Sequence, residues 1–167
     1  SKNIPEYWNG NIPWISASSM HEKLLNDSEL RITEKAVKSG AKIVKKDTIL
    51  ILVRGSILFK RIPIGITARS VSFNQDVKAI ILNKEVYKLY LLYFLIANER
   101  FIPIDKTGIG AGKIDLKDLK TFKIFVPRNQ KEQQKIASCL STFDELISAH
   151  QDKLAALKEH KKGLVQN

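Results

Sequence analysis

The sequence predicts an α+β protein: a globular body with a mixed or mainly antiparallel sheet and a few helices, followed by one long helix of the coiled-coil type. Short β-branched runs interrupted by Gly and Pro fill residues 1–127, whereas residues 128–167 have no Pro, one Gly and a helical periodicity. We therefore expect a body over 1–127 and a helix over 128–167. With 167 residues, 44% of them hydrophobic, the chain can form one packed core but not two ordinary domains.

Local patterns predict the elements of the body in order. Thr33 should cap a short helix that ends at Lys38, before Gly40, and a Lys46-Asp47 turn should lead into a strand at 49–53. A second strand is expected at 77–82 and a last one at 122–126, which ends where Pro127 lacks an amide donor. Between them Asn83 is expected to cap a helix from about residue 84 to 98, with a buried face made of Val86, Leu89, Tyr90, Tyr93, Phe94 and Ala97.

The C-terminal segment has the clearest periodicity. Asn129 and Glu132 resemble a capping box that opens a helix at about Gln130. Apolar residues then recur at alternating steps of four and three, interrupted by His150 and Lys161, and this 3.5-residue repeat is typical of a coiled coil. The helix-pairing positions we expect are Ile136, Leu140, Phe143, Ile147, Leu154, Leu157 and Leu164. An amphipathic helix lying on its own domain is the alternative, but about 37 residues at 1.5 Å each reach about 55 Å, beyond the width of such a body.

Candidate catalytic patterns fail on their spacing. The segment TGIGAGK at 107–113 has three residues between its outer glycines where a phosphate loop needs four, and Ile114 replaces the metal-binding Ser or Thr. We interpret it as a turn, flexible or in contact with phosphate. The carboxylates Asp47, Asp76, Asp115 and Asp118 lack the spacing of a metal-dependent nuclease. We therefore expect a non-catalytic protein without metal or cofactor.

The composition favours a polyanionic partner. There are 28 Lys and Arg against 17 Asp and Glu, a formal net charge of +11, so nucleic acid is the first expected partner and an anionic membrane the second. The longest apolar run, residues 89–97, is too short to cross a bilayer and is expected to be a buried helix rather than a membrane segment. No export signal is evident. The single cysteine, Cys139, is expected to be a packing residue in a reducing cytoplasm.

The positive charge is concentrated in the body, which has 21 Lys and Arg against 12 Asp and Glu. Arg can grip guanine through two donors, and the Asn or Gln amide can do the same for adenine. Lys42 and Lys45 are expected to contact phosphate without reading sequence. The candidate DNA-binding residues are Arg54, Ser56, Lys60, Arg61, Arg69, Asn74, Gln75 and Lys113.

Four segments together resemble the specificity subunits of type I restriction-modification systems. NGNIPWISASSM at 9–20 is similar to the initial segment of their target-recognition domains, and SGAKIVKKDTILILVRGSI at 39–57 to a helix end, turn and strand before an Arg-Gly loop. SFNQDVKAI at 72–80 and GKIDLKDLKTFKIFVPRNQKEQQKIA at 112–137 resemble the later strand and the approach to the spacer helix. The last is the most specific, and together the matches cover nearly the whole chain.

This resemblance implies a subunit that recognises double-stranded DNA. In the family, two recognition domains each read one half of a split site, and two antiparallel helices hold them apart. The implied partners are methyltransferase subunits, a restriction subunit that translocates and cleaves DNA, and a second recognition half, or another copy, paired through the C-terminal helix. The sequence has only one recognition domain and one helix. A fragment, one half of a longer subunit and a half-sized subunit that dimerises are therefore all open.

Two other functions are open on the residues alone. The helix can be an oligomerisation device on a basic body that binds nucleic acid without sequence specificity. A nuclease that acts alone is the other. Sequence preference in DNA binding separates the first from a recognition subunit, because electrostatic attraction alone gives affinity but little preference. Cleavage by the purified chain with magnesium would establish the second.

Overall fold

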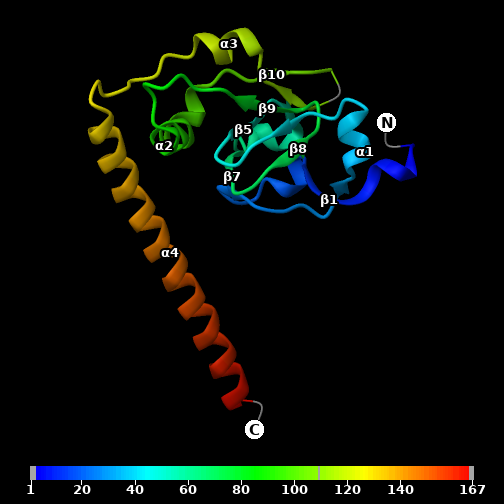
Figure 1. Ribbon diagram of the computed structural model, residues 1–167. Helices are drawn as coiled ribbons and strands as arrows, with labels where there is room; N and C mark the ends of the chain where they lie inside the picture. Colours follow the sequence, from blue (N-terminus) through cyan, green and yellow to red (C-terminus); the bar gives the residue numbers. More distant parts are fainter. Residues whose placement is uncertain (1–2, 109, 166–167) are drawn as a thin grey trace.

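The computed structural model describes residues 3–108 and 110–165, which form a body of three small sheets with one long helix projecting from its edge (Figure 1). The first sheet has the order β3-β1-β8-β4, the second β2-β7-β5-β9 and the third β10-β11-β6. The pairs β1–β8 and β2–β7 are parallel and the other pairs are antiparallel. The expected α+β class with mainly antiparallel pairing is confirmed, although three short sheets replace one.

The strands are short, and their bounds follow in chain order. They are β1 Trp8–Ile15, β2 Leu24–Leu25, β3 Arg31–Ile32, β4 Ile43–Val44, β5 Ile49–Leu52, β6 Arg54–Gly55, β7 Ile64–Thr67, β8 Val71–Phe73, β9 Val77–Ile80, β10 Asp105–Lys106 and β11 Gly112–Lys113. The α-helices are α1 Glu34–Lys38, α2 Lys88–Asn98, α3 Leu116–Thr121 and α4 Gln130–Val165. Single 3-10 turns lie at Pro5–Tyr7, Ala17–Ser19, Ser56–Phe59 and Glu99–Phe101.

The core lies around β5, whose four residues Ile49–Leu52 are all buried. Such a strand, apolar on both faces, needs cover on both sides. Leu91, Leu92 and Leu95 of α2 belong to the same buried cluster as Ile15 of β1. The body therefore has one continuous core that joins the first two sheets to α2.

Local signals located α1 correctly. The Thr33 side chain accepts a hydrogen bond from the backbone N–H of Ala36, and Gly40 follows the helix with a positive φ of 105°. Asp47, in the expected turn, has a φ of 68°. The strands at 49–53 and 77–82 are present as β5 and β9, each shorter than predicted.

The helix predicted from residue 84 begins only at Lys88, so its expected start and Asn83 cap were wrong. The Asn83 side chain instead accepts a bond from the N–H of Glu85 in a local turn. The amide of Gln133 in α4 binds the N–H of Tyr87 and the carbonyl of Glu85. This tertiary contact holds the segment out of the helix.

The predicted buried face of α2 was also wrong in part. Its buried residues are Tyr90, Leu91, Leu92 and Leu95, whereas Ala97 is exposed. The reason is that α2 packs between β7 and α4 and so buries parts of two sides. A pattern built for one buried face does not describe a helix in that position.

The strand predicted at 122–126 is not formed: this segment pairs with no described strand, and its Phe122 and Ile124 line a groove beside β9 instead of bonding to it. A side chain takes over one of its backbone groups: the hydroxyl of Tyr90 donates to the carbonyl of Phe125 at 2.7 Å. The long helix α4 does begin at Gln130, as expected, and the Asn129 side chain accepts from the N–H of Lys131. Cys139, expected to pack, is exposed on α4.

No helix within 3–108 or 110–165 combines the length and the apolar character needed to span a membrane.

Candidate functional site

The exposed hairpin β10–β11 and strand β6 bring two cations side by side. Lys113 in β11 lies directly opposite Arg54 in β6, and Asp105 in β10 lies opposite Lys113 on the other side. Directly opposed residues of an antiparallel pair point to the same face of the sheet. Both Arg54 and Lys113 are exposed, and Ser56, also exposed, follows in the next turn.

Val53 connects this pair to the turn after β8. Its N–H donates to the carbonyl of Asp76 at 2.7 Å, and its carbonyl accepts from the N–H of Ile114 at 2.9 Å. The backbone next to Arg54 is therefore bonded on one side to the chain after Gln75 and on the other to the chain after Lys113. Three segments distant in sequence thus meet at one edge of the body.

Within that turn the two amide residues differ. The Asn74 side-chain oxygen accepts from the N–H groups of Asp76 and Val77, each at 3.1 Å, and so it shapes the turn. Gln75 is exposed. Because bidentate adenine contact needs both the oxygen and the nitrogen of an amide, Gln75 suits that contact better than Asn74.

Lys42 adds a further charge to this edge. It precedes β4, whose Ile43 and Val44 lie opposite Ser72 and Val71 of β8, so continuing the register places Lys42 opposite Phe73. It is exposed, beside the Asn74–Gln75 turn. We call Lys42, Arg54, Ser56, Gln75 and Lys113 the basic edge.

The other candidates lie outside the basic edge. Arg61 donates through Nη2 to the carbonyl of Met20 at 2.9 Å, a bond that ties two loops of the body together. Lys60 is exposed beside it. Arg69 lies in the turn between β7 and β8, near the carboxylate of Asp27.

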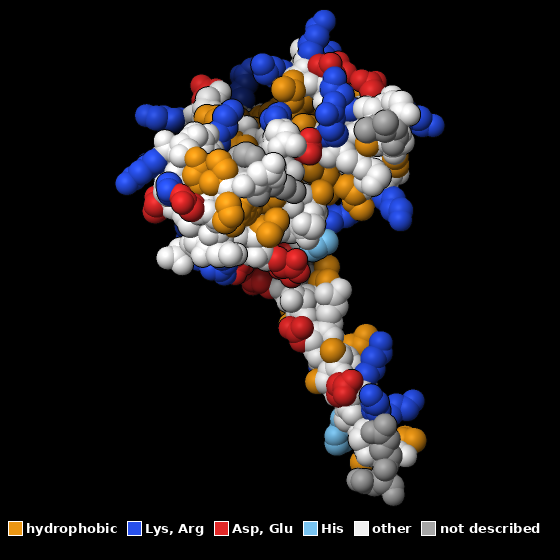
Figure 2. Space-filling view, turned by 90° about the vertical axis from the view of Figure 1, so that its right-hand side faces the viewer, with side chains coloured by type: hydrophobic (Ala, Val, Ile, Leu, Met, Phe, Trp, Pro, Cys, Tyr) orange, Lys and Arg blue, Asp and Glu red, His pale blue; other side chains and the backbone are white. Residues whose placement is uncertain are grey.

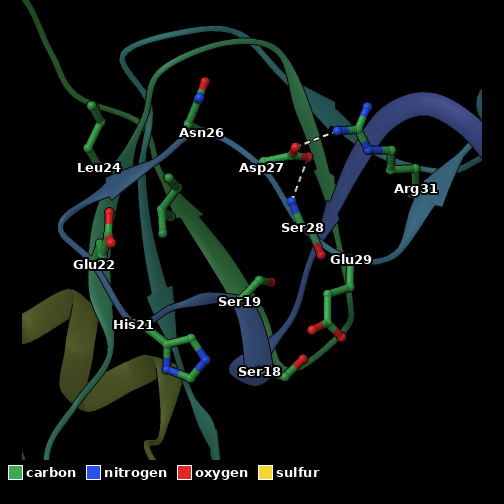
Figure 3. Close-up of a pocket in the computed structure, with 11 residues that line it drawn as sticks. Ser18, Ser19, His21, Glu22, Leu24, Asn26, Asp27, Ser28, Glu29 and Arg31 are labelled. Atoms are coloured by element: carbon green, nitrogen blue, oxygen red, sulfur yellow. Dashed lines mark hydrogen bonds and ion pairs between the residues drawn. The ribbon is translucent and has the colours of Figure 1, made fainter. Parts of the chain in front are cut away.

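A polar hollow of about 660 Å³ is lined by residues between Ser18 and Arg31 (Figure 3), and no pattern in the sequence indicated it. The Asp27 carboxylate accepts from the N–H of Ser28 and forms an ion pair with Arg31, while His21 lies at the other end of the hollow. The N–H of Ser28 first, then Arg31 and Arg69, hold the pKa of Asp27 below its usual value. With Glu22 and Glu29 also lining it, the hollow is unsuited to phosphate.

The helix α4 is fastened to the body at its first turns. Gln133, only 1% exposed, binds the N–H of Tyr87 through its side-chain oxygen and the carbonyls of Glu85 and Pro127 through its nitrogen. Further along, Asp144 accepts a bond from the hydroxyl of Tyr93 and forms an ion pair with Lys23. Sequence reasoning missed these anchors, because polar residues of a heptad helix are indistinguishable from its solvated face.

The expected pairing positions are exposed along the same helix. Their exposed fraction rises from 36% at Ile136 to 67% at Leu164, and Leu146 adds a further exposed apolar side chain. At about 100° per residue these positions lie on average about a quarter turn from the face of Gln133, Ala137 and Asp144 that contacts the body, from about 40° at Leu140 to about 160° at Leu164. Figure 2 shows hydrophobic side chains exposed along α4 and Lys and Arg around the periphery of the body. The body therefore does not cover the apolar seam.

In the part of the chain that the structure describes, no group of three or more His, Cys, Asp or Glu is placed to hold a metal ion. Lys113 lies in strand β11 and α3 begins only at Leu116, so the lysine is not in the first turn of a helix and the geometry of a phosphate loop is not formed. Ile109 of that segment lies outside the described residues. Asp115 caps α3 through the N–H of Lys117.

The family model of the type I restriction modification DNA specificity domain matches residues 1–159 of the chain. The chain belongs to this family. It is 40% identical over 153 residues to the EcoR124I/EcoR124II specificity subunit of Escherichia coli, an alignment that covers 89% of this chain and 38% of that protein. It is 34% identical over 152 residues to the MjaIX specificity subunit of Methanocaldococcus jannaschii, covering 88% and 34%.

Solved structures show the same fold for this specificity domain. A chain from a structure on complex assembly and conformational transition of the type I R-M system superposes with a TM-score of 0.69 at 17% identity, over 96% of this chain and 38% of that one. The HsdS subunit from Thermoanaerobacter tengcongensis gives 0.60 at 16% identity, over 87% and 34%. This specificity domain thus spans little more than a third of the relatives it matches. Their names assign them specificity, which agrees with the non-catalytic role expected from the sequence.

Proposed function

We propose that the body reads one half of a bipartite sequence in double-stranded DNA for a type I restriction-modification complex. Membership of the DNA specificity family and the basic edge support this proposal. The proposed base contacts are Arg54 and Gln75, with Ser56 beside them, and the proposed phosphate contacts are Lys42 and Lys113. Lys60, Arg61, Arg69 and Asn74 lie outside the edge or serve the fold, so they have no base-reading role in this proposal.

The observation that carries the proposal is the pairing of Arg54 with Lys113. Like charges directly opposite each other destabilise a strand pair, and Asp105 offsets only part of the repulsion because it lies beyond Lys113. An anion between the two cations removes the repulsion. A DNA phosphate meets this need and brings the neighbouring base edges within reach of Arg54 and Gln75.

The second recognition half is proposed to join through the seam of α4. Under this proposal residues 1–127 are the recognition domain and 128–167 the spacer helix, and the assembled pair docks methyltransferase and restriction subunits in the cytoplasm. The length of the relatives supports a second half, because this chain covers only 38% and 34% of the two named above. That half is either another copy of this chain or a separate recognition domain.

Selection of bound duplexes from a random pool by the full chain tests the proposal. We expect enrichment of a defined half-sequence, with an affinity that falls as salt rises. Enrichment of no sequence, with salt-dependent binding retained, would instead support a basic oligomerisation module without specificity. Repeating the selection with Arg54→Ala distinguishes a base contact from a phosphate contact, since only the former changes the preferred sequence.

A further inference from the structure

An apolar groove runs along the free edge of the second sheet, on a side of the body that the proposed function does not use. It has a volume of about 530 Å³. Its walls are β9 and the segment that follows it, the face of α2 with Leu91 and Leu95, and the chain from Leu116 to Ile124. At its rim Ile81 is 81% exposed and Leu116 42% exposed. An exposed apolar groove of this kind is more often an interaction site than an ordinary part of the solvated surface.

The groove follows the edge of the strand rather than one of its faces. Five consecutive residues, 78–82, all line it. Residues 78–80 belong to β9, and side chains of consecutive strand residues point to opposite faces of a sheet, so a groove that all three line must follow the edge. β9 is the last strand of its sheet, and no other described strand pairs with its outer side.

The register shows which backbone groups point into the groove. The N–H of Val53 bonds to the carbonyl of Asp76, and the pairs Ile51–Lys78 and Ile49–Ile80 follow at steps of two. In an antiparallel pair, alternate residues bond to the neighbour and the residues between them point away from it. Lys78 and Ile80 therefore bond to β5, and the N–H and carbonyl of Ala79 point outward.

The charges that line the groove have one sign. Lys78 and Lys120 line it, and no carboxylate does. We propose that this β9 groove binds an extended segment of a partner protein that adds to β9 as a further strand and alternates apolar side chains with carboxylates. Its backbone pairs with Ala79, its apolar side chains fill the space beside Leu91 and Leu95, and its carboxylates meet the two lysines.

The groove is separate from the pairing seam, and it meets the basic edge at Lys78, whose ammonium donates to the carbonyl of Gln75. The groove lies between β9, α2 and α3, whereas the basic edge is formed by β6, β11 and the turn after β8, and the pairing seam lies on α4. An apolar groove between strand and helix gives DNA few contacts. A second copy of this chain is the other occupant to distinguish, and its binding would depend on protein concentration alone.

A random library of short linear peptides displayed on phage, selected against the immobilised full chain, tests the proposal. We expect enriched peptides to alternate apolar and acidic residues. Their affinity should fall about tenfold for Ala79→Pro, which removes the outward N–H without touching the bonds to β5, and should be retained by Ala79→Val. Lys78→Glu with Lys120→Glu should weaken them as strongly, whereas Lys123→Glu, outside the groove, should not.

The outcomes are distinct. Absence of any enriched peptide, or enriched peptides that bind Ala79→Pro and the double Lys→Glu variant as well as the parent chain, would overturn the proposal. Self-association lost on Ala79→Pro but unchanged by substitutions in the α4 seam would replace the partner protein with a second copy. If Ala79→Pro does not fold, as judged by circular dichroism, the double lysine variant alone decides.

Discussion

The hydroxyl of Tyr93 in α2 donates a 2.7 Å hydrogen bond to the carboxylate of Asp144, which lies 51 residues later in α4. The same carboxylate forms an ion pair with Lys23, whose ammonium lies 5.5 Å from the centre of the Tyr93 ring. Together with Gln133 this contact fixes α4 at two points about 16 Å apart along its axis. Two separated points define the direction of a rod, so the seam is held in a fixed direction relative to the basic edge.

Removing the hydroxyl of Tyr93 should weaken this anchor. We expect Tyr93→Phe to lower the free energy of unfolding by about 1 kcal/mol, because the Asp144 carboxylate loses one donor but keeps Lys23. Denaturant titration of the full chain measures this. Tyr87→Phe is the matched control, since the bond of residue 87 to α4 is made by its backbone N–H. An equal loss in both variants would contradict a specific role for the Tyr93 hydroxyl.

The anchor should also respond to pH. Burial acts to raise the pKa of Asp144, but the bonds from Lys23 and Tyr93 outweigh it and the net pKa lies below its ordinary value. The folded state therefore binds the proton less well than the unfolded chain does. The contribution of Asp144 to stability is present above its ordinary pKa and is lost as pH falls through the folded one.

Unfolding of Asp144→Asn should consequently depend less on pH in the acid range than unfolding of the parent chain. Urea titrations between about pH 3 and pH 6 measure the difference. Asp152→Asn, on the exposed part of α4, serves as the control.

At alkaline pH the dependence of stability on pH has the opposite sign. Burial first, then Asp144, raise the pKa of Tyr93 to about 12. Its contribution is present below its usual pKa of about 10 and is lost as pH rises towards 12.

The helices that local capping residues and periodicity specify could be predicted from the sequence. Thr33 and Gly40 delimit α1, Asn129 opens α4, and the heptad repeat indicates its length. Tertiary contacts decided the rest. Gln133 delays the start of α2 to Lys88. The Tyr90 hydroxyl satisfies a backbone group of the segment 122–126, whose pattern predicts a strand but which pairs with no described strand. Patterns in a single sequence do not reveal contacts between residues that lie far apart in the chain.

The candidate site shows the same division. Residue type identified Arg54, Gln75 and Lys113 as able to contact DNA, but their proximity depends on the two bonds of Val53 to distant segments. The sequence alone could not distinguish Asn74 from Gln75 as a base contact. In the structure the side-chain oxygen of Asn74 is occupied by the turn, whereas Gln75 is exposed. The parallel pair β1–β8 joins strands more than fifty residues apart, and no local signal specifies it.

Substitutions at the basic edge should separate base reading from phosphate binding. We expect Arg54→Ala to alter which half-sequence is selected, with a loss that is about 1 to 3 kcal/mol larger on the preferred duplex than on a random one, because Arg54 also lies beside the proposed phosphate. Lys42→Ala should weaken specific and random duplexes alike and reduce the salt slope by about one. Lys60→Ala removes a positive charge outside the basic edge, so it should change neither the selected half-sequence nor the salt slope. Binding isotherms at several salt concentrations measure all three, and equal losses for Arg54→Ala and Lys42→Ala on both duplexes would refute the assignment.

The seam of α4 should drive self-association of the free chain. Leu154→Glu places a charge in the seam, so we expect the dissociation constant of the dimer to rise at least about 30-fold, equivalent to about 2 kcal/mol. Ala155→Glu introduces the same charge at the next, exposed position and should have little effect. Sedimentation equilibrium at tens of micromolar measures both. A parent chain that remains monomeric there would show that the seam needs a different partner.

The length of α4 should set the distance between the two half-sites. The helix has 36 residues, and among the described residues its last hydrogen bond or ion pair with the body is at Asp144, so deleting residues 154–160 leaves both anchors intact. Seven residues at 1.5 Å each are about 10 Å, and removing a whole heptad keeps the seam in phase. At 3.4 Å per base pair this corresponds to about three base pairs, or fewer where the helix axis is inclined to the DNA.

We therefore expect the heptad deletion to shorten the spacer between two unchanged half-sequences, as measured by selecting duplexes from a random pool in the presence of methyltransferase subunits. Deletion of the five residues 154–158 is the control. It shortens the helix by a similar amount but turns the lower part of the seam by about 140°, so pairing and bipartite selection should both be lost. A spacer that stays unchanged after the heptad deletion, with both half-sequences still selected, would show that α4 does not determine it.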